Sequence, residues 1–229
     1  MSAPPPLGNV RACVFDAYGT LFDVASAAQR AADDLGDAAA PLAALWREKQ
    51  LQYSWLRAIQ GRHADFWQVT GDALDFALDA LGIAEIARRE RLMQLYLRLD
   101  AYPEVSPTLR RLRAKGVATA ILSNGTPAML AVAVAHAGLG ALFDHVLSVE
   151  EAGVYKPHPD VYRLALDRLS LGAAQIAFVS SNGWDAWAAA AFGMRAVWCN
   201  RQKQPREHLP GMPCAEIGWL AELPPLLGA

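Results

Sequence analysis

The chain has few cysteines, no excess of basic residues and no long apolar run. Its 229 residues include 3 cysteines and carry a formal net charge of −2 at pH 7. Nucleic-acid binding normally needs a basic surplus, so nucleic acid is not an expected partner. No run approaches the ~20 apolar residues that span a bilayer, and residues 1–9 lack the order of a secretory signal. These absences predict a cytoplasmic protein with no membrane partner.

Motifs that hold metals or dinucleotides are missing as well. Cys13, Cys199 and Cys214 are widely spaced, which favours reduced thiols over a disulfide framework or a zinc site. The 5 histidines form no H-E-x-x-H pattern. A dinucleotide site would need G-x-G-x-x-G after the first strand, where Gly19 is the only glycine. The sequence therefore predicts neither a metal nor a cofactor.

Alternating strand-like and helix-like segments form the main pattern that is present. An apolar content of 53% with 19% charged residues is enough for a sizeable core. Short apolar runs predict strands at Val10–Phe15, Val117–Leu122, His145–Val149, Ile176–Val179 and Ala196–Cys199. Helices are expected between them at Thr108–Lys115, Pro127–Ala137, Pro159–Leu169 and Trp184–Phe192. This order predicts an α/β fold with a parallel sheet covered on both faces, and ligands beyond the carboxyl ends of its strands.

One segment interrupts this alternation. From about Ser26 to Leu99 the patterns are helical and rich in Ala, Leu, Arg and Trp, with no convincing strand. Because it follows the first strand, the segment predicts an all-helical cap inserted over the active end of the sheet. We expect a core domain of residues 1–22 and 100–229 and a cap domain of residues 23–99.

Residues 42–59 of this insertion predict one long helix. Its apolar stripe is expected to comprise Leu42, Leu45, Trp46, Tyr53 and Leu56. Arg47 and Leu51, four residues apart, lie on a different face.

Four polar clusters follow predicted strands or the loops after them. They are Asp16–Thr20, Ser123–Gly125, Lys156–Pro157 and Ser180–Asp185. Each cluster alone is typical of a turn or a helix cap. Because parallel strands end at one edge of a sheet, the four clusters should converge there. Turn formation alone does not explain why four polar clusters meet at one edge.

The order and spacing of these clusters resemble the haloacid dehalogenase superfamily of hydrolases over nearly the whole chain. The pattern D-x-x-G-T-L-F at Asp16–Phe22 resembles the nucleophile motif of the superfamily. Ser123-Asn124 resembles the second motif and Lys156 the third. The resemblance implies a Rossmann-like parallel sheet core flanked by helices, with an inserted all-helical cap domain.

Two absences distinguish between the reactions of this superfamily. Its phosphatases usually carry D-x-D and an acidic final motif that helps hold magnesium. Here the second position is Tyr18, and the final motif S-S-N-G-W-D has Asp185 as its only carboxylate. Magnesium prefers several hard oxygen ligands, and phosphoryl transfer without the ion would lack its main charge stabiliser. A monoanionic haloacid needs no such ion, and its halide leaves without a proton.

The patterns D-A-Y-G-T-L-F-D, W-R-E-K-Q-L-Q-Y-S-W-L-R and S-S-N-G-W-D are closely similar to those of the L-2-haloacid dehalogenases. The resemblance implies an enzyme that converts (S)-2-haloalkanoic acids to (R)-2-hydroxyalkanoic acids plus halide, with inversion. Asp16 would attack C2 and form an ester, and water activated by Asp185 would hydrolyse it. The expected catalytic set is Asp16, Lys156, Asp185, Thr20, Ser180 and Asn182.

Substrate contacts are also implied by the resemblance. Ser123 and the N–H groups after Asp16 would hold the carboxylate, and Arg47, Asn124 and Trp184 the departing halide. The expected substrate-binding set is Ala17, Tyr18, Arg47, Leu51, Phe66, Ser123, Asn124 and Trp184. Glu48 stands where such relatives often have glutamine, and would either perturb Arg47 or face solvent.

The sequence alone leaves two other functions open. One is a phosphatase or phosphonate hydrolase on the same fold, and another is a non-catalytic binding protein that has kept it. The expected partners are a small 2-haloacid and a halide ion, and the resemblance also admits a homodimer.

Overall fold

The computed structural model describes residues 7–24, 26, 30, 35–83 and 86–228. In this part of the chain, a parallel six-stranded sheet has the order β5-β4-β1-β6-β7-β8. Its strands are β1 (Ala12–Phe15), β4 (Ala118–Ser123), β5 (His145–Ser148), β6 (Ile176–Ser180), β7 (Arg195–Cys199) and β8 (Ala215–Ile217). The five predicted strands are confirmed. The sequence did not indicate β8, a three-residue edge strand whose central Glu216 is exposed.

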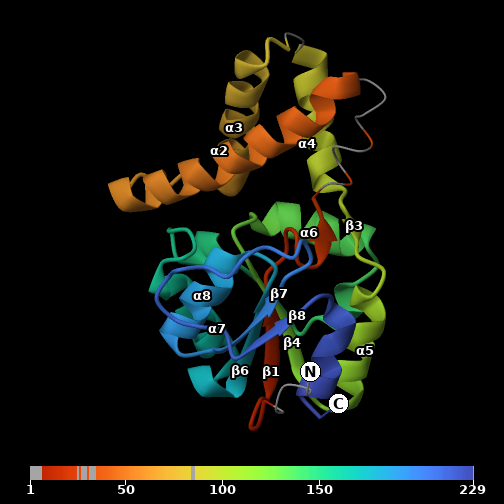
Figure 1. Cartoon of the computed structure of the whole chain (residues 1–229), viewed down its shortest axis with the longest axis vertical. Helices are drawn as coiled ribbons and strands as arrows, with labels where there is room; N and C mark the ends of the chain where they lie inside the picture. Colours follow the sequence, from red (N-terminus) through yellow and green to blue (C-terminus); the bar gives the residue numbers. More distant parts are fainter. Residues whose placement is uncertain (1–6, 25, 27–29, 31–34, 84–85, 229) are drawn as a thin grey trace.

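Helices cover both faces of this sheet, with α7 and α8 on one side and α5 on the other (Figure 1). They are α5 (Val105–Ala114), α6 (Pro127–His136), α7 (Pro159–Leu169), α8 (Gly183–Phe192) and the short α9 (Leu223–Leu226). β1 is fully buried, as its continuous apolar run predicts for a strand with covered faces. The predicted α/β fold is therefore confirmed. α5 begins three residues before the prediction, because Pro107 lies in its first turn, where proline is tolerated.

A helical layer lies above the carboxyl end of the sheet (Figure 1). It contains α2 (Ala39–Gln60), α3 (Phe66–Ala80) and α4 (Ile86–Leu97). Two short antiparallel strands, β2 (Phe22–Asp23) and β3 (Asp100–Ala101), lie where the chain enters and leaves this layer. Residues 1–6 of the expected core, and residues 25, 27–29, 31–34 and 84–85 of the expected insertion, lie outside the described part of the chain.

The predicted apolar stripe of α2 is partly wrong. Leu42 and Trp46 are buried, but Leu56 is 46% exposed. The buried face continues at four-residue spacing through Gln50 and Ser54, which are polar. Apolar periodicity does not reveal this face, because its second half buries hydrogen-bonding side chains.

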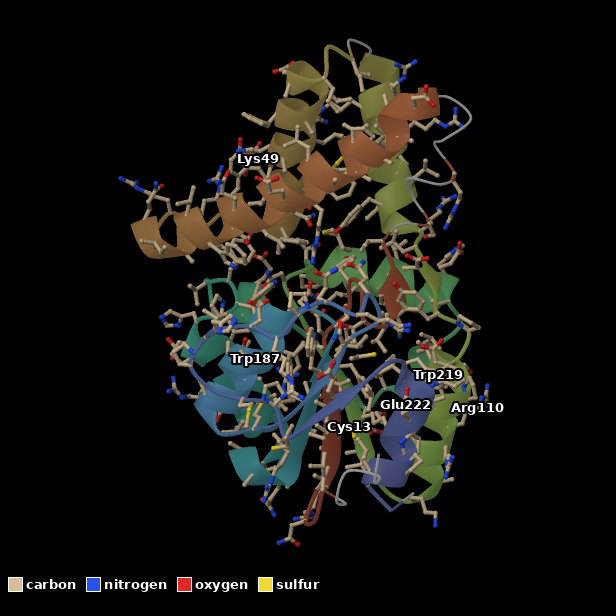
Figure 2. All side chains as sticks on the ribbon, in the orientation of Figure 1. Cys13, Lys49, Arg110, Trp187, Trp219 and Glu222 are labelled. Carbon is tan, nitrogen blue, oxygen red and sulfur yellow. The ribbon has the colours of Figure 1, made fainter. Side chains whose placement is uncertain are left out.

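The three cysteines form no disulfide with one another, as expected for reduced thiols. Cys13, labelled in Figure 2, and Cys199 are buried in the sheet, while Cys214 is exposed, and all three are free. In the described residues, no helix has both the length and the apolar content needed to cross a membrane.

Candidate active site

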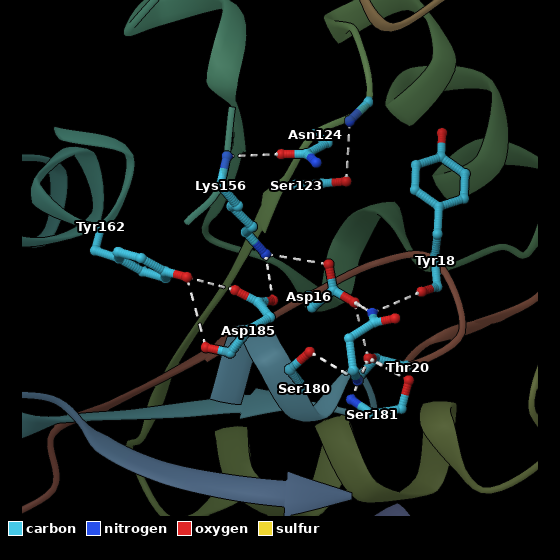
Figure 3. Close-up of polar contacts among 12 residues, drawn as sticks. Asp16, Tyr18, Thr20, Ser123, Asn124, Lys156, Tyr162, Ser180, Ser181 and Asp185 are labelled. Atoms are coloured by element: carbon cyan, nitrogen blue, oxygen red, sulfur yellow. Dashed lines mark hydrogen bonds and ion pairs between the residues drawn. The ribbon is translucent and has the colours of Figure 1, made fainter. Parts of the chain in front are cut away.

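The sheet topology brings the four polar clusters together. Asp16 directly follows β1, Ser123 ends β4, and Ser180 ends β6 beside Asp185 in the first turn of α8. Lys156 reaches the same edge from the loop before α7, and Figure 3 shows its side chain pointing toward Asp16 and Asp185. Convergence of parallel strand ends thus creates one polar site beneath the helical layer.

Asp16 is held by three donors and is only 6% exposed. Its Oδ1 accepts a hydrogen bond from Lys156 Nζ at 3.1 Å. Its Oδ2 accepts from Thr20 Oγ1 at 3.0 Å and from Asn182 Nδ2 at 2.9 Å. The carboxylate is therefore fixed in place while it remains an anion, the state in which it can act as a nucleophile.

Lys156 is 1% exposed and lies between two carboxylates. Its Nζ is 3.1 Å from Asp16 Oδ1 and 2.8 Å from Asp185 Oδ2. Burial alone would lower the pKa of Lys156, but the two carboxylates more than offset burial and raise it above its ordinary value. The backbone N–H of Lys156 donates to Asn124 Oδ1 at 3.2 Å, which fixes the base of the side chain.

Asp185 is fully buried, with an exposure of 0%. Burial raises its pKa above the ordinary value, and Asp16 adds to the rise, while Lys156 and Tyr162 oppose it. The Tyr162 hydroxyl donates to Asp185 Oδ1 at 2.7 Å. A carboxylate with a raised pKa next to the proposed ester has the properties of a general base.

Replacing Tyr162 with phenylalanine is expected to slow turnover by about tenfold to 100-fold, the usual value of a hydrogen bond to a charged group. Because this hydrogen bond lowers the pKa of Asp185, its loss raises that pKa further. Asp185 then stays protonated to higher pH, so the acidic limb of the kcat profile moves upward. Tyr53→Phe on α2 is the matched control, and an unshifted limb in Tyr162→Phe would contradict the role given to this contact.

Arg47 joins the helical layer to the site. It extends from α2, and its Nη2 donates to Asn182 Oδ1 at 3.2 Å. Asn182 in turn donates to Asp16 through Nδ2. Arg47 therefore lies in the same hydrogen-bond network as the carboxylate, whereas Glu48 is exposed and faces solvent.

Aromatic rings form one wall beside Asp16. Tyr18 is buried, stacks on Tyr96 at 5.4 Å between ring centroids, and lies 6.0 Å from Phe66. Burial raises the pKa of Tyr18 well above its ordinary value, so its phenol stays neutral. A side chain at Gly125 would lie 2.8 Å from the Tyr18 ring, which explains the glycine. Leu51 is half-buried on α2.

Several expected residues make contacts that belong to local turns. Ser123 Oγ accepts from the Gly125 N–H at 3.1 Å, and Ser180 Oγ accepts from the Asn182 N–H at 3.2 Å. The carbonyl of the buried Ala17 accepts N–H groups from the turn after it. These contacts order the loops around Asp16, and direct substrate binding by these residues stays a prediction.

Trp184 lies in the first turn of α8 and contacts the helical layer. Its ring packs edge-on against Trp55 of α2, at 5.4 Å between centroids. It lines a cleft of ≈ 980 Å³ together with Trp55, Tyr155 and Tyr162. The expected role of Trp184 in halide binding stays a prediction.

Four residues of the site are absent from the expected catalytic and substrate-binding sets, although Ser181 belongs to the predicted cluster Ser180–Asp185. Ser181 donates its N–H to Thr20 Oγ1 at 2.8 Å, and Tyr162 contacts Asp185 as described. Gln50 and Tyr96 are buried; Gln50 contacts Arg47, and Tyr96 contacts Gln50. A polar residue four positions after Trp46 on the buried face of α2 was the signal available for Gln50.

The donor set does not fit a magnesium ion. The Lys156 ammonium lies between Asp16 and Asp185, at 3.1 Å and 2.8 Å, and already supplies a positive charge to both carboxylates. Tyr18, a buried phenol, occupies the second position of the first motif. In the described residues, no group of three or more His, Cys, Asp or Glu side chains could hold a metal.

Comparison with known proteins identifies the class. A model of the haloacid dehalogenase-like hydrolase family matches residues 10–193, so the chain belongs to this family. Within it, (S)-2-haloacid dehalogenase 1 of Pseudomonas sp. (strain CBS-3) is 47% identical over 219 residues, 95% of this chain and 96% of that protein. The resemblance to the L-2-haloacid dehalogenases is therefore confirmed.

Solved structures agree with this assignment. A dehalogenase crystal structure has a TM-score of 0.95 and 43% identity, covering 97% of this chain and 99% of that one. The L-2-haloacid dehalogenase of Xanthobacter autotrophicus, solved with chloropropionic acid covalently bound, has a TM-score of 0.88 and 38% identity. That alignment covers 96% of this chain and 99% of the other.

Proposed function

We propose that the protein is a hydrolytic (S)-2-haloacid dehalogenase that yields the (R)-2-hydroxy acid and halide. The observation that carries this proposal is the Asp16 carboxylate, which Lys156 holds at 3.1 Å and which is followed two positions later by the buried phenol of Tyr18 rather than by a second aspartate. High identity to a protein named (S)-2-haloacid dehalogenase supports the substrate class. The covalently bound chloropropionic acid of a similar structure supports a covalent intermediate.

In the first step, Asp16 attacks C2 of the haloacid in line with the carbon–halogen bond. Halide leaves, the carbon inverts and an ester forms. Lys156, Thr20 and Asn182 orient the carboxylate for this attack. Arg47, at the cap side of Asn182, supplies positive charge toward the departing halide.

In the second step, water attacks the carbonyl carbon of the Asp16 ester. Asp185 accepts the proton of this water, and Lys156 and Tyr162 hold Asp185 in position. The ester bond between the acyl carbon and the oxygen attached to C2 breaks. That oxygen, which belonged to Asp16, takes the proton from Asp185 and leaves in the hydroxy acid. The water oxygen stays on Asp16, and the second water proton passes to solvent as the carboxylate re-forms.

The proposal also divides the chain into two domains. The core domain is assigned residues 1–22 and 100–229, and the cap domain residues 23–99. Pairing of β2 with β3, in which Phe22 lies opposite Ala101, supports a connection at this point. The substrate would bind between Asp16 of the core and Arg47 of the cap. The free cysteines are in keeping with the proposed cytoplasmic location.

Halide release from the two enantiomers of 2-chloropropionate, with and without a chelator, tests the proposal. We expect turnover of the (S) enantiomer to (R)-lactate, with no effect of the chelator because Lys156 supplies the positive charge at Asp16. Magnesium-dependent release of phosphate from a phosphomonoester, without any halide release, would instead establish the phosphatase alternative. Binding of haloacid without turnover would establish the non-catalytic one.

A further inference from the structure

Arg47 has a second hydrogen-bond partner that the reaction steps do not use. Its Nη1 donates to Gln50 Oε1 at 2.7 Å, while its Nη2 donates to Asn182. Gln50 lies one turn further along α2 and is 1% exposed. One terminal nitrogen of the guanidinium thus contacts a buried amide on its own helix, and the other contacts Asn182 of the core.

The orientation of the Gln50 amide is fixed by its other partners. Thr70 Oγ1 donates its single proton to the Phe66 carbonyl at 2.6 Å, so it can only accept from Gln50. Gln50 Nε2 donates to that oxygen at 2.8 Å and contacts Tyr96 Oη at 3.1 Å. The amide oxygen must then face Arg47, which has donors only.

This chain of hydrogen bonds links the two sides of the site. It begins at Phe66 on α3, part of the aromatic wall, and ends at Arg47, which contacts Asn182. Tyr96, on α4, contacts Gln50 and also stacks on Tyr18. The network therefore ties the guanidinium to the aromatic wall through buried groups that have little freedom to move.

We propose that Gln50 is a positioning residue that aims the Arg47 guanidinium at the departing halide, an inference that rests on the proposed function. A neutral amide suits this task because it orients the guanidinium and leaves its charge available to an anion. A carboxylate at the same position would form an ion pair with Arg47 and oppose the approach of halide.

The experiment compares (S)-2-chloropropionate with (S)-2-bromopropionate in Gln50→Met and Gln50→Glu. Chloride is the poorer leaving group and needs more stabilisation than bromide. For Gln50→Met we expect kcat to fall by about 100-fold on the chloro acid, the usual effect of a misplaced catalytic group, and by clearly less on the bromo acid. For Gln50→Glu we expect product inhibition by bromide to weaken, because the new carboxylate neutralises Arg47.

Gln52→Met is the matched control. Gln52 lies on the same helix, where its Oε1 accepts from Lys49 Nζ at 2.8 Å; Lys49 is labelled in Figure 2. Both kcat values and the bromide inhibition of Gln52→Met should equal those of the wild type. Melting temperatures of all variants separate a loss of fold from a loss of positioning.

Equal losses on both substrates, with unchanged bromide inhibition in Gln50→Glu, would overturn the inference and leave Gln50 a structural residue. Wild-type kinetics in both Gln50 variants would overturn it as well. A wild-type protein that releases no halide from either substrate would remove the proposed function, and with it the basis of this inference.

Discussion

Halide release from (S)-2-chloropropionate is expected to fall by about 10⁴-fold or more when Asp16 is replaced by asparagine. An amide keeps the shape of the side chain but has no anionic oxygen to attack C2. It also removes the partner of Lys156 at 3.1 Å, while Thr20 and Asn182 can still contact the side-chain oxygen. The loss should appear in kcat, and the fold should be retained because Lys156 keeps Asp185 at 2.8 Å as its counter-ion.

A single turnover of the wild type in heavy-oxygen water gives an independent readout. Because water attacks the acyl carbon of Asp16, the label should enter the peptide that contains Asp16. Label in the hydroxy acid after the first turnover would show direct attack of water on C2 and would contradict the ester. Asp79→Asn, an exposed position on α3, is the matched control for the Asp16 variant.

The sequence was most informative where topology decides the outcome. Asp16, Lys156 and Asp185 come from distant segments, yet their convergence follows from strands that run parallel and end at one edge. Since a one-residue shift would turn a strand's side chains to the other face, a polar residue at a strand end is tightly placed. The convergence of strand ends does not depend on how side chains pack, so it could be predicted from the sequence.

Packing between helices could not be predicted in the same way. Gln50 was overlooked because a polar residue is normally expected on a solvated face, and its burial depends on how α2 lies against α3 and α4. Leu56 was expected on a buried stripe, but it is 46% exposed because it lies two positions after the buried Ser54, and so on the opposite side of α2. The surroundings of Trp184 depend on helix packing in the same way, because its ring contacts Trp55 of α2.

Replacing Lys156 with methionine is expected to lower halide release by about 10³-fold, as when a positioned charge-stabilising donor is removed. It is also expected to destabilise the fold by about 3–5 kcal/mol, since Asp16 and Asp185 would remain buried without their cation. Lys115→Met, at an exposed position, is the control for loss of a positive charge.

The destabilisation should depend on pH in a defined direction. Lys156 lowers the pKa of Asp185, so its removal raises further a pKa that burial has already raised. A group with a raised folded-state pKa favours the folded protein at low pH and loses this effect as pH rises through that pKa. The difference in unfolding free energy between wild type and Lys156→Met should therefore be largest near neutral pH and shrink on acidification. Denaturant unfolding at a series of pH values measures this difference, and a constant value across the series would show that Lys156 stabilises the fold by packing rather than by its charge.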